Sequence, residues 1–355
     1  MRVVVAGGGT AGHIEPALNL ADELRRRNPE TEVLALGTQR GLEVTLVPAR
    51  GYQLATIPPV PLPRRIGTDL VTLPRRLRTA IAQTRKIILD FQADVVVGFG
   101  GYVSIPAYLA ARGHVPIVVH EANAKAGLAN KVGARFADAI AESFSGSLPG
   151  AQLTGNPLRK VIAEFDRSAL HDRARKEFGI TGDRPVVLVF GGSLGAASLN
   201  NFVKEFLATP QSEQVVILHS HGAKNSPAAE QSERYIPLAY IERMELAYAA
   251  ADFVVCRSGA MTVAEVTAAG LPACFVPLAH GNGEQSLNAR PVVDAGGGLM
   301  IADAQFSAAQ FISQVLPLLK NPSQCNSMAI KSKSLGLPNA AALLADMVEQ
   351  VKAGA

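Results

Sequence analysis

Residues 3–27 read VVVAGGGTAGHIEPALNLADELRRR and indicate the fold class of the chain. Three valines lead into a run of glycines, and a segment with apolar residues at the i, i+3 and i+4 positions of a helix follows. A buried strand, a glycine turn and a helix in this order open a doubly wound parallel sheet. A similar stretch, PVVLVFGGSLGAASLNNFVKEF, begins at Pro185. The two openings predict an α/β chain with two Rossmann-like domains in series.

Apolar runs along the rest of the chain continue this alternation of strands and helices. A turn signal at Gly155-Asn156-Pro157 predicts a first domain at 1–157 and a second at 158–337. A last helical pattern, within 338–355, can pack on the first domain or on the second. Strands are predicted at residues 3–6, 33–36, 95–97, 117–119, 186–190, 215–218, 253–255 and 274–276.

The composition is that of a soluble globular enzyme, with 48% hydrophobic and 18% charged residues among 355. Cys256, Cys274 and Cys325 have no metal-ligand spacing, and we interpret them as small buried side chains in a reducing compartment. The chain opens directly on a predicted strand, and no apolar run reaches the roughly 18 residues of a membrane span. We therefore expect a cytoplasmic protein.

Positive charge is concentrated in the first half of the chain. Residues 1–157 contain 17 Lys and Arg against 12 Asp and Glu, a net charge of +5. A basic segment of this kind can bind nucleic acid, an anionic membrane or nothing. Nucleic acid is disfavoured, because no aromatic residues are interleaved with the cations and no reader motif is present. The excess lies at Arg64, Arg65, Arg75, Arg76, Arg78, Arg85 and Lys86, opposed there only by Asp69.

The first glycine run matches the spacing of a dinucleotide-binding turn, Gly7-x-Gly9-x-x-Gly12. A nicotinamide site also needs an acid at the end of the second strand, and LGTQR at residues 36–40 has none. The NAD hypothesis is therefore disfavoured. His13 follows the last glycine, where an imidazole can act as a base near neutral pH. The alternative is a histidine that packs locally at a helix start.

The second half carries a further set of polar residues at predicted turns. Ser193 lies in the second glycine turn, where it can meet an anion or simply cap a helix. Glu265 lies about one and a half turns into a predicted helix, from which a carboxylate can accept two hydroxyls of a ribose or a sugar. Its apolar neighbours disfavour the alternative of a solvated helix face. Gln285 and Asn288, three apart, share a helical face.

An ordered set of motifs spanning nearly the whole chain resembles the MurG-type glycosyltransferases of peptidoglycan synthesis. The resemblance implies the two-domain GT-B fold with an interdomain cleft. It also implies an inverting hexosyltransferase that moves N-acetylglucosamine from UDP-N-acetylglucosamine to the muramyl sugar of lipid I, forming lipid II. The motifs are Gly8-Gly9-Thr10-Ala11-Gly12-His13 with Pro16, Gly100-Gly101-Tyr102, His120-Glu121-Ala122-Asn123, Gly155-Asn156-Pro157-Leu158-Arg159, Gly191-Gly192-Ser193 and Arg257-Ser258-Gly259-Ala260 with Glu265.

The resemblance also implies roles for individual residues. His13 and Glu121 would line the acceptor side, with His13 as the expected base and Glu121 as the second candidate. Ile241 would lie near the uracil, Glu265 would hold the ribose, and Gln285 and Asn288 would hold the donor sugar. The other implied donor contacts are Thr10, Ala11, Gly12, Asn123, Arg159, Ser193, Ala260, Met261 and Thr262.

The first domain would then bind the acceptor and the membrane, and the second would bind UDP-N-acetylglucosamine. No cofactor or tightly held metal is implied, because two helix ends can stabilise the departing diphosphate. The basic segment mixes arginines with Ile66, Leu70, Leu73, Leu77 and Ile81, which suits an anionic membrane at its cytoplasmic face. Its apolar residues can alternatively face the protein core. Other cell-wall or division proteins are further candidate partners.

Three other functions fit parts of this pattern. A UDP-N-acetylglucosamine 2-epimerase would share the fold but would need additional catalytic carboxylates. A glycosyltransferase with another acceptor would share the donor motifs. A nucleotide-sugar-binding protein without activity would dispense with His13 and Glu121. The Ala11 in place of the family's usual glycine is tolerable only if the φ angle there is negative.

Overall fold

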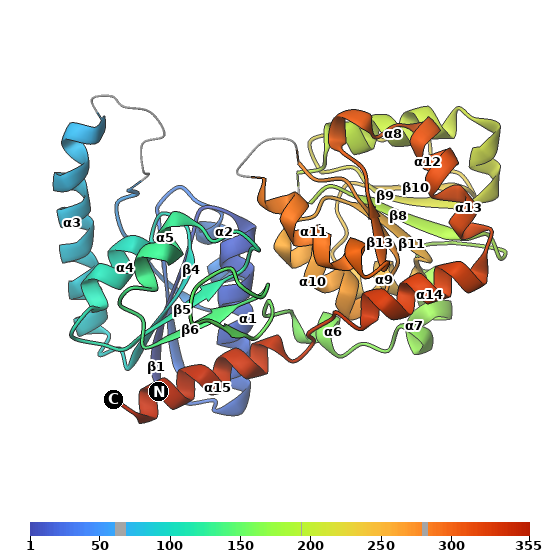
Figure 1. Cartoon of the computed structure of the whole chain (residues 1–355). Helices are drawn as coiled ribbons and strands as arrows, with labels where there is room; N and C mark the ends of the chain where they lie inside the picture. Colours follow the sequence, from blue (N-terminus) through green and yellow to red (C-terminus); the bar gives the residue numbers. More distant parts are fainter. Residues whose placement is uncertain (61–68, 193, 279–282) are drawn as a thin grey trace. The chain divides into compact units, whose positions relative to one another are not determined.

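The computed structural model describes residues 1–60, 69–192, 194–278 and 283–355. The chain divides into two compact units, one made of Met1–Leu158 with Pro338–Ala355 and the other of Arg159–Leu337. Each unit is built around one parallel sheet with helices on its faces (Figure 1). The sequence prediction of an α/β chain with two doubly wound sheets is confirmed.

The first unit contains a seven-stranded sheet in the order β3-β2-β1-β4-β5-β6-β7. The order reverses between β1 and β4, which makes the carboxyl ends of these strands the switch point where ligands bind in such sheets. The strands are β1 Arg2–Gly7, β2 Glu32–Gly37, β3 Gln53–Thr56, β4 Val95–Gly100, β5 Ile117–Glu121, β6 Ala139–Glu142 and β7 Gln152–Leu153. The helices are α1 Ala11–Arg27, α2 Glu43–Ala49, α3 Asp69–Asp90, α4 Ser104–Ala111, α5 Leu128–Gly133 and α15 Ala340–Ala353.

Alternation along β1 explains how helices cover both faces of this sheet. Val3 and Val5 point to one face, where they join a buried cluster with residues of α1 and α15. Val4 and Ala6 point to the other face and pack with residues of α3 and α4. The chain's last helix, α15, lies beside α1 (Figure 1).

The second unit contains a six-stranded sheet in the order β10-β9-β8-β11-β12-β13, which switches between β8 and β11. Its core includes Val187 and Val189 of β8 with Phe202 and Phe206 of α8. The strands are β8 Val186–Phe190, β9 Val216–Ser220, β10 Tyr235–Leu238, β11 Phe253–Cys256, β12 Ala273–Phe275 and β13 Gly298–Met300. The helices are α6 Lys160–Ala163, α7 Arg167–Glu177, α8 Ala197–Leu207, α9 Met244–Ala250, α10 Ala260–Ala269, α11 Glu284–Asp294, α12 Ala308–Gln314, α13 Leu316–Leu319 and α14 Pro322–Lys333, with 3₁₀ turns at Pro210–Gln214 and Asp303–Gln305.

The long helix α3 carries the described part of the basic segment. Its buried residues Ala80, Thr84 and Ile88 recur every four positions, so this face packs on the first unit. The residues Arg75, Arg78, Arg85 and Lys86 are exposed. Ile81 packs partly against the core cluster, so the alternative of a core-facing apolar side holds for this part of the helix. Arg64, Arg65 and Ile66 lie outside the described residues.

No described helix has both the length and the hydropathy needed to cross a bilayer.

Candidate functional site

His13 is the third residue of α1, and the turn before the helix sets its place. Thr10 caps α1 with an extended backbone, and its hydroxyl is hydrogen-bonded to Nδ1 of His13 at 3.1 Å. The imidazole lies against Gly100, whose φ angle is +96°. A Cβ at this glycine would lie 3.2 Å from Cδ2 and Nε2 of the ring. Both the positive φ angle and this close approach therefore favour glycine after β4.

Glu121, at the end of β5, organises the loop that follows it. Only 2% of the residue is exposed. Its Oε1 accepts the N–H of Asn123 at 2.9 Å, and its Oε2 accepts the N–H of Gly127 at 3.0 Å. Oε2 also accepts Nδ2 of Asn130 at 2.9 Å, and Asn130 is held in turn by the hydroxyl of Tyr108. Because both oxygens already accept hydrogen bonds, this arrangement favours a positioning role for Glu121 over that of a base.

The electrostatic surroundings of His13 suit a proton acceptor. Burial lowers the pKa of His13, while the charge of Glu121 and a hydrogen bond with the Gly8 backbone raise it. The net shift is downward from the ordinary value, so the imidazole is neutral at pH 7. A neutral imidazole can take a proton from a bound hydroxyl.

The first unit thus gathers several of the residues predicted from the sequence. Ala11 opens α1, and among described residues Gln92 alone is a non-glycine with a positive φ angle. The φ angle of Ala11 is therefore negative, so its methyl group is tolerated where the family usually has glycine. The predicted residues that belong to this group are Thr10, Ala11, Gly12, His13, Glu121 and Asn123.

Glu265 lies on α10 of the second unit, next to a buried tyrosine. The hydroxyl of Tyr248, which is fully buried, donates to Oε2 of Glu265 at 2.8 Å. Burial raises the pKa of Tyr248, the charge of Glu265 raises it further, and Arg159 lowers it. The charges of Arg159 and Glu265 therefore both act on Tyr248. The fold thus brings together these two predicted residues, which are far apart in the sequence.

The amino end of α10 has the features of an anion site. Ala260, Met261 and Thr262 form its first turn, where backbone N–H groups point out of the helix. Ser258, just before it, is fully buried, and its hydroxyl has no hydrogen-bond partner among the described residues. Asn288 of α11 donates to the carbonyl of Ser258 at 3.3 Å, which joins the two helix starts.

Arg257 ties together the loops at this end of the second sheet. Its guanidinium donates to the carbonyl of Val276 at 3.0 Å, to Asp303 at 2.6 Å and to the hydroxyl of Ser198 at 2.9 Å. Ser198 also donates to Asp303 at 2.6 Å. These bonds join the segment after β12, the start of α8 and a 3₁₀ turn, so they fix the frame around the start of α10.

Gln285, Ile241 and Ser193 are the remaining residues that the sequence predicted for the donor site. Oε1 of Gln285, in the first turn of α11, accepts the N–H of Leu278 at 2.9 Å. Ile241 is buried just before α9, so only its backbone and part of its side chain can meet a ligand. Ser193 lies outside the described residues. Among the described residues no group of three or more His, Cys, Asp or Glu could hold a metal ion.

Tyr248 and Asn130 were missed by sequence reasoning. Tyr248 lies in the apolar pattern of a helix, and Asn130 lies in a short helix with no motif of its own. Their contacts with Glu265 and Glu121 span 17 and 9 residues. A buried polar side chain needs a partner, but no spacing in the sequence indicates which one.

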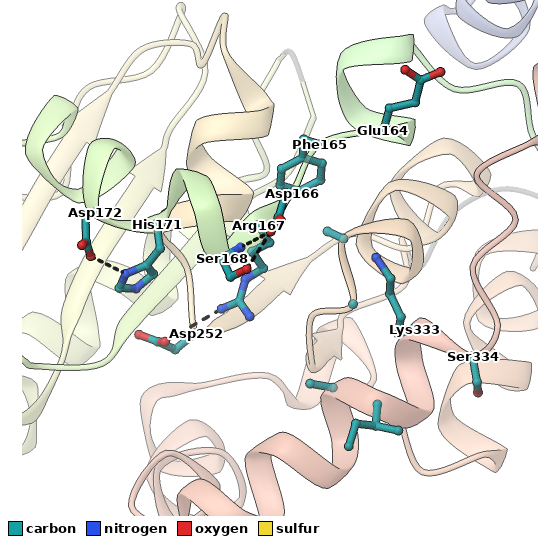
Figure 2. A pocket seen from close by; sticks show the side chains of 14 residues that line it. Glu164, Phe165, Asp166, Arg167, Ser168, His171, Asp172, Asp252, Lys333 and Ser334 are labelled. Atoms are coloured by element: carbon teal, nitrogen blue, oxygen red, sulfur yellow. Dashed lines mark hydrogen bonds and ion pairs between the residues drawn. The ribbon is translucent and has the colours of Figure 1, made fainter.

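The second unit has a large open pocket that does not include the start of α10 (Figure 2). It is lined by Asp252, directly before β11, whereas Arg257 and Ser258 directly follow that strand. The pocket therefore lies at the amino end of β11, and the start of α10 lies at its carboxyl end. Its charged residues have internal partners, since Asp166 caps α7 and Arg167 donates to the carbonyls of Tyr248 and Ala251. This pocket is not part of the candidate site.

Two doubly wound parallel sheets in series, with ligand-binding features at their carboxyl edges, define the GT-B class of glycosyltransferases. Residues 3–142 match the glycosyltransferase family 28 N-terminal domain, and residues 186–344 match the glycosyltransferase family 28 C-terminal domain. The chain belongs to glycosyltransferase family 28.

Similar proteins cover almost the whole chain. An enzyme of Mycolicibacterium smegmatis named UDP-N-acetylglucosamine–N-acetylmuramyl-(pentapeptide) pyrophosphoryl-undecaprenol N-acetylglucosamine transferase is 52% identical, over 99% of this chain and 94% of the relative. Its namesake from Saccharopolyspora erythraea is 54% identical, over 98% and 94%. The crystal structure of Acinetobacter baumannii MurG matches with a TM-score of 0.78 and 28% identity, over 98% of this chain and 99% of that one.

A UDP-GlcNAc 2-epimerase from Neisseria meningitidis shares the fold. Its structure matches with a TM-score of 0.67 at 14% identity, over 99% of this chain and 100% of that one. At this identity the likeness concerns the fold alone.

The coupling between His13 and Glu121 can be measured directly. Glu121→Gln removes the negative charge that raises the pKa of His13, so that pKa should fall further below its ordinary value. The imidazole would then stay neutral to lower pH. An NMR titration of the His13 ring, assigned with a His13→Gln sample, checks the direction. Glu32→Gln, at an exposed position, is the control; an unchanged or higher His13 pKa in Glu121→Gln would contradict the coupling.

Proposed function

We infer that this chain transfers N-acetylglucosamine from UDP-N-acetylglucosamine to lipid I and thereby forms lipid II. The observation that carries the inference is the 52–54% identity, over nearly the full chain, to enzymes named for this transfer. The geometry adds a neutral buried imidazole in one unit and an anion-binding helix start beside a hydroxyl-accepting carboxylate in the other. The first unit would serve the acceptor and the second the donor.

His13 is the proposed base of this reaction. A hydroxyl of the muramyl sugar attacks the anomeric carbon of the donor sugar with inversion, and the bond from that carbon to UDP breaks. The bond's electron pair leaves with the diphosphate, and the hydroxyl proton passes to the imidazole of His13. Glu121 supports the proton transfer by raising the basicity of the ring and by holding the loop that carries Asn123.

The donor is proposed to bind mainly through the second unit. The diphosphate meets the first turn of α10 and the hydroxyl of Ser258, where the helix dipole favours negative charge. The ribose hydroxyls meet Glu265, which Tyr248 orients, and Arg159 lies close enough to balance the carboxylate charge. The sugar would contact Gln285 and Asn288 together with Thr10, Ala11, Gly12 and Asn123, with Ser193 and Ile241 completing the donor set.

Turnover decides between this function and its alternatives. The protein is incubated with radiolabelled UDP-N-acetylglucosamine and a lipid I analogue, beside His13→Ala and the exposed control His114→Ala. Labelled disaccharide-lipid should form with wild type and control, and kcat should fall by about 10²–10⁴-fold in His13→Ala, as expected for loss of a general base. Donor consumption without transfer to lipid I would indicate another acceptor or epimerisation, and undiminished turnover by His13→Ala would rule out its role as base.

We also propose that the first unit rests on an anionic membrane surface through α3. A lipid-linked acceptor stays in the bilayer, so the enzyme has to approach it. The exposed face of α3 carries Arg75, Arg78, Arg85 and Lys86, while its buried face is occupied by the core. The attraction is then mainly electrostatic, with each cation contributing about 1 kcal/mol near the surface.

Vesicle co-sedimentation tests this surface. Combined reversal of Arg75, Arg78 and Arg85 to Glu should weaken binding to anionic phospholipid vesicles by more than about tenfold, and raised salt should do the same. Reversal of three exposed lysines of the second unit, Lys204, Lys224 and Lys320, is the matched control. Equal loss in both variants, or loss in neither, would contradict the assignment to α3.

A further inference from the structure

A buried carboxylate that the proposed mechanism does not use lies beside the first glycine turn. It belongs to Glu43, the first residue of α2, which is completely buried. Its Oε2 accepts the backbone N–H of Gly9 at 3.2 Å. Its Oε1 accepts both the backbone N–H and the hydroxyl of Thr38 at 2.8 Å. One side chain therefore joins the loop after β1 to the loop after β2.

The surrounding glycines show that both loops are shaped to receive this side chain. A methyl group at Gly37 would overlap Cγ of Glu43, and one at Gly41 would overlap its carboxylate. A methyl group at Gly8 would lie 3.2 Å from Oε1. The carboxylate fills the space that these three glycines leave, so it is an integral part of the turn.

The carboxylate accepts a backbone N–H of the glycine turn, a group that Rossmann-like turns commonly offer to a phosphate. Burial by itself would raise the pKa of Glu43, but hydrogen bonds from its own backbone, Thr38 and Gly9 lower it below the ordinary value. The group is thus ionised at neutral pH and holds the turn from within the protein.

The residue next to Gly9 connects this contact to the proposed base. Thr10 caps α1, and its hydroxyl is hydrogen-bonded to Nδ1 of His13. We propose that Glu43 is a positioning residue, which fixes the N–H of Gly9 and so sets the place of Thr10 and the orientation of His13. This inference rests on the proposed role of His13 as base.

Two variants disturb this contact in different ways. Gly41→Ala places a methyl group where the carboxylate lies, and the flexible end of Glu43 has to move while its charge remains. Glu43→Gln keeps the shape and removes the charge. Both should lower kcat by about 10–100-fold, since small misplacements of a catalytic group have effects of this size. The KM for UDP-N-acetylglucosamine should rise by a smaller factor than kcat falls, because only the proposed contact of the first glycine turn with the donor sugar is disturbed, while the diphosphate and the ribose are proposed to bind to the second unit.

A second readout separates positioning from general destabilisation. If the turn loosens in Gly41→Ala, water reaches the imidazole and the burial that lowers the pKa of His13 is relieved. The acid limb of the kcat/KM profile should then move to higher pH. The matched control is Glu142→Gln, another buried carboxylate of the same unit, which accepts the N–H groups of Gly146, Ser147 and Leu148. Its acid limb should not move. UDP-binding stoichiometry gives the folded fraction of each variant.

The outcomes are separable. If Gly41→Ala and Glu43→Gln match Glu142→Gln in kcat per folded molecule and in the acid limb, the positioning role is overturned. If the double variant is no worse than either single variant, the two changes act through one contact, which supports the inference. Retained turnover in His13→Ala would instead overturn the proposed base itself. Should Glu43→Gln fail to fold, Gly41→Ala alone decides the question.

Discussion

Backbone groups at the carboxyl edge of a parallel sheet have to find hydrogen-bond partners, and the structure of the first unit depends on how they do so. Glu43, Glu121 and Glu142 follow or end β2, β5 and β6, and each accepts backbone N–H groups of a neighbouring loop. All three are nearly or fully buried. The bonds of Glu43 and Glu121 hold the loops beside His13, whereas those of Glu142 hold the separate loop that follows β6.

At the carboxyl ends of its strands, the second unit has hydrogen-bond donors where the first unit has carboxylates. Arg257 donates to a backbone carbonyl and to Asp303, while the hydroxyl of Ser258 and the start of α10 face no carboxylate in any described hydrogen bond. A diphosphate is repelled by buried carboxylates and attracted to a helix start. This difference is consistent with the proposed division of roles, in which the second unit would hold the departing diphosphate and the first unit would supply a neutral imidazole.

The long apolar runs predicted eight strands correctly, because central parallel strands are buried on both faces. The apolar runs did not predict the other described strands, most of which lie at or near a sheet edge, are short and are partly exposed. These strands are β3, β6, β7, β10 and β13.

The glycine turn and the position of His13 could be predicted from local spacing. Its neighbour Glu121 was predicted only through the family resemblance and not from local spacing, because the two residues are 108 apart and the pairing of β1 with β4 and of β4 with β5 brings their ends together. The role of Glu43 could not be predicted, because residues 36–40 contain no acid. The carboxylate that binds this turn comes instead from the start of α2.

We propose that the second unit alone holds the nucleotide diphosphate. Hydrogen–deuterium exchange of the full chain, measured with and without UDP, which lacks the donor sugar, is the decisive test. Exchange should slow at residues 257–265 and stay unchanged at residues 7–13, whose Gly9 N–H already bonds to Glu43. Protection at residues 7–13 without protection at 257–265 would overturn the proposed roles of the two units.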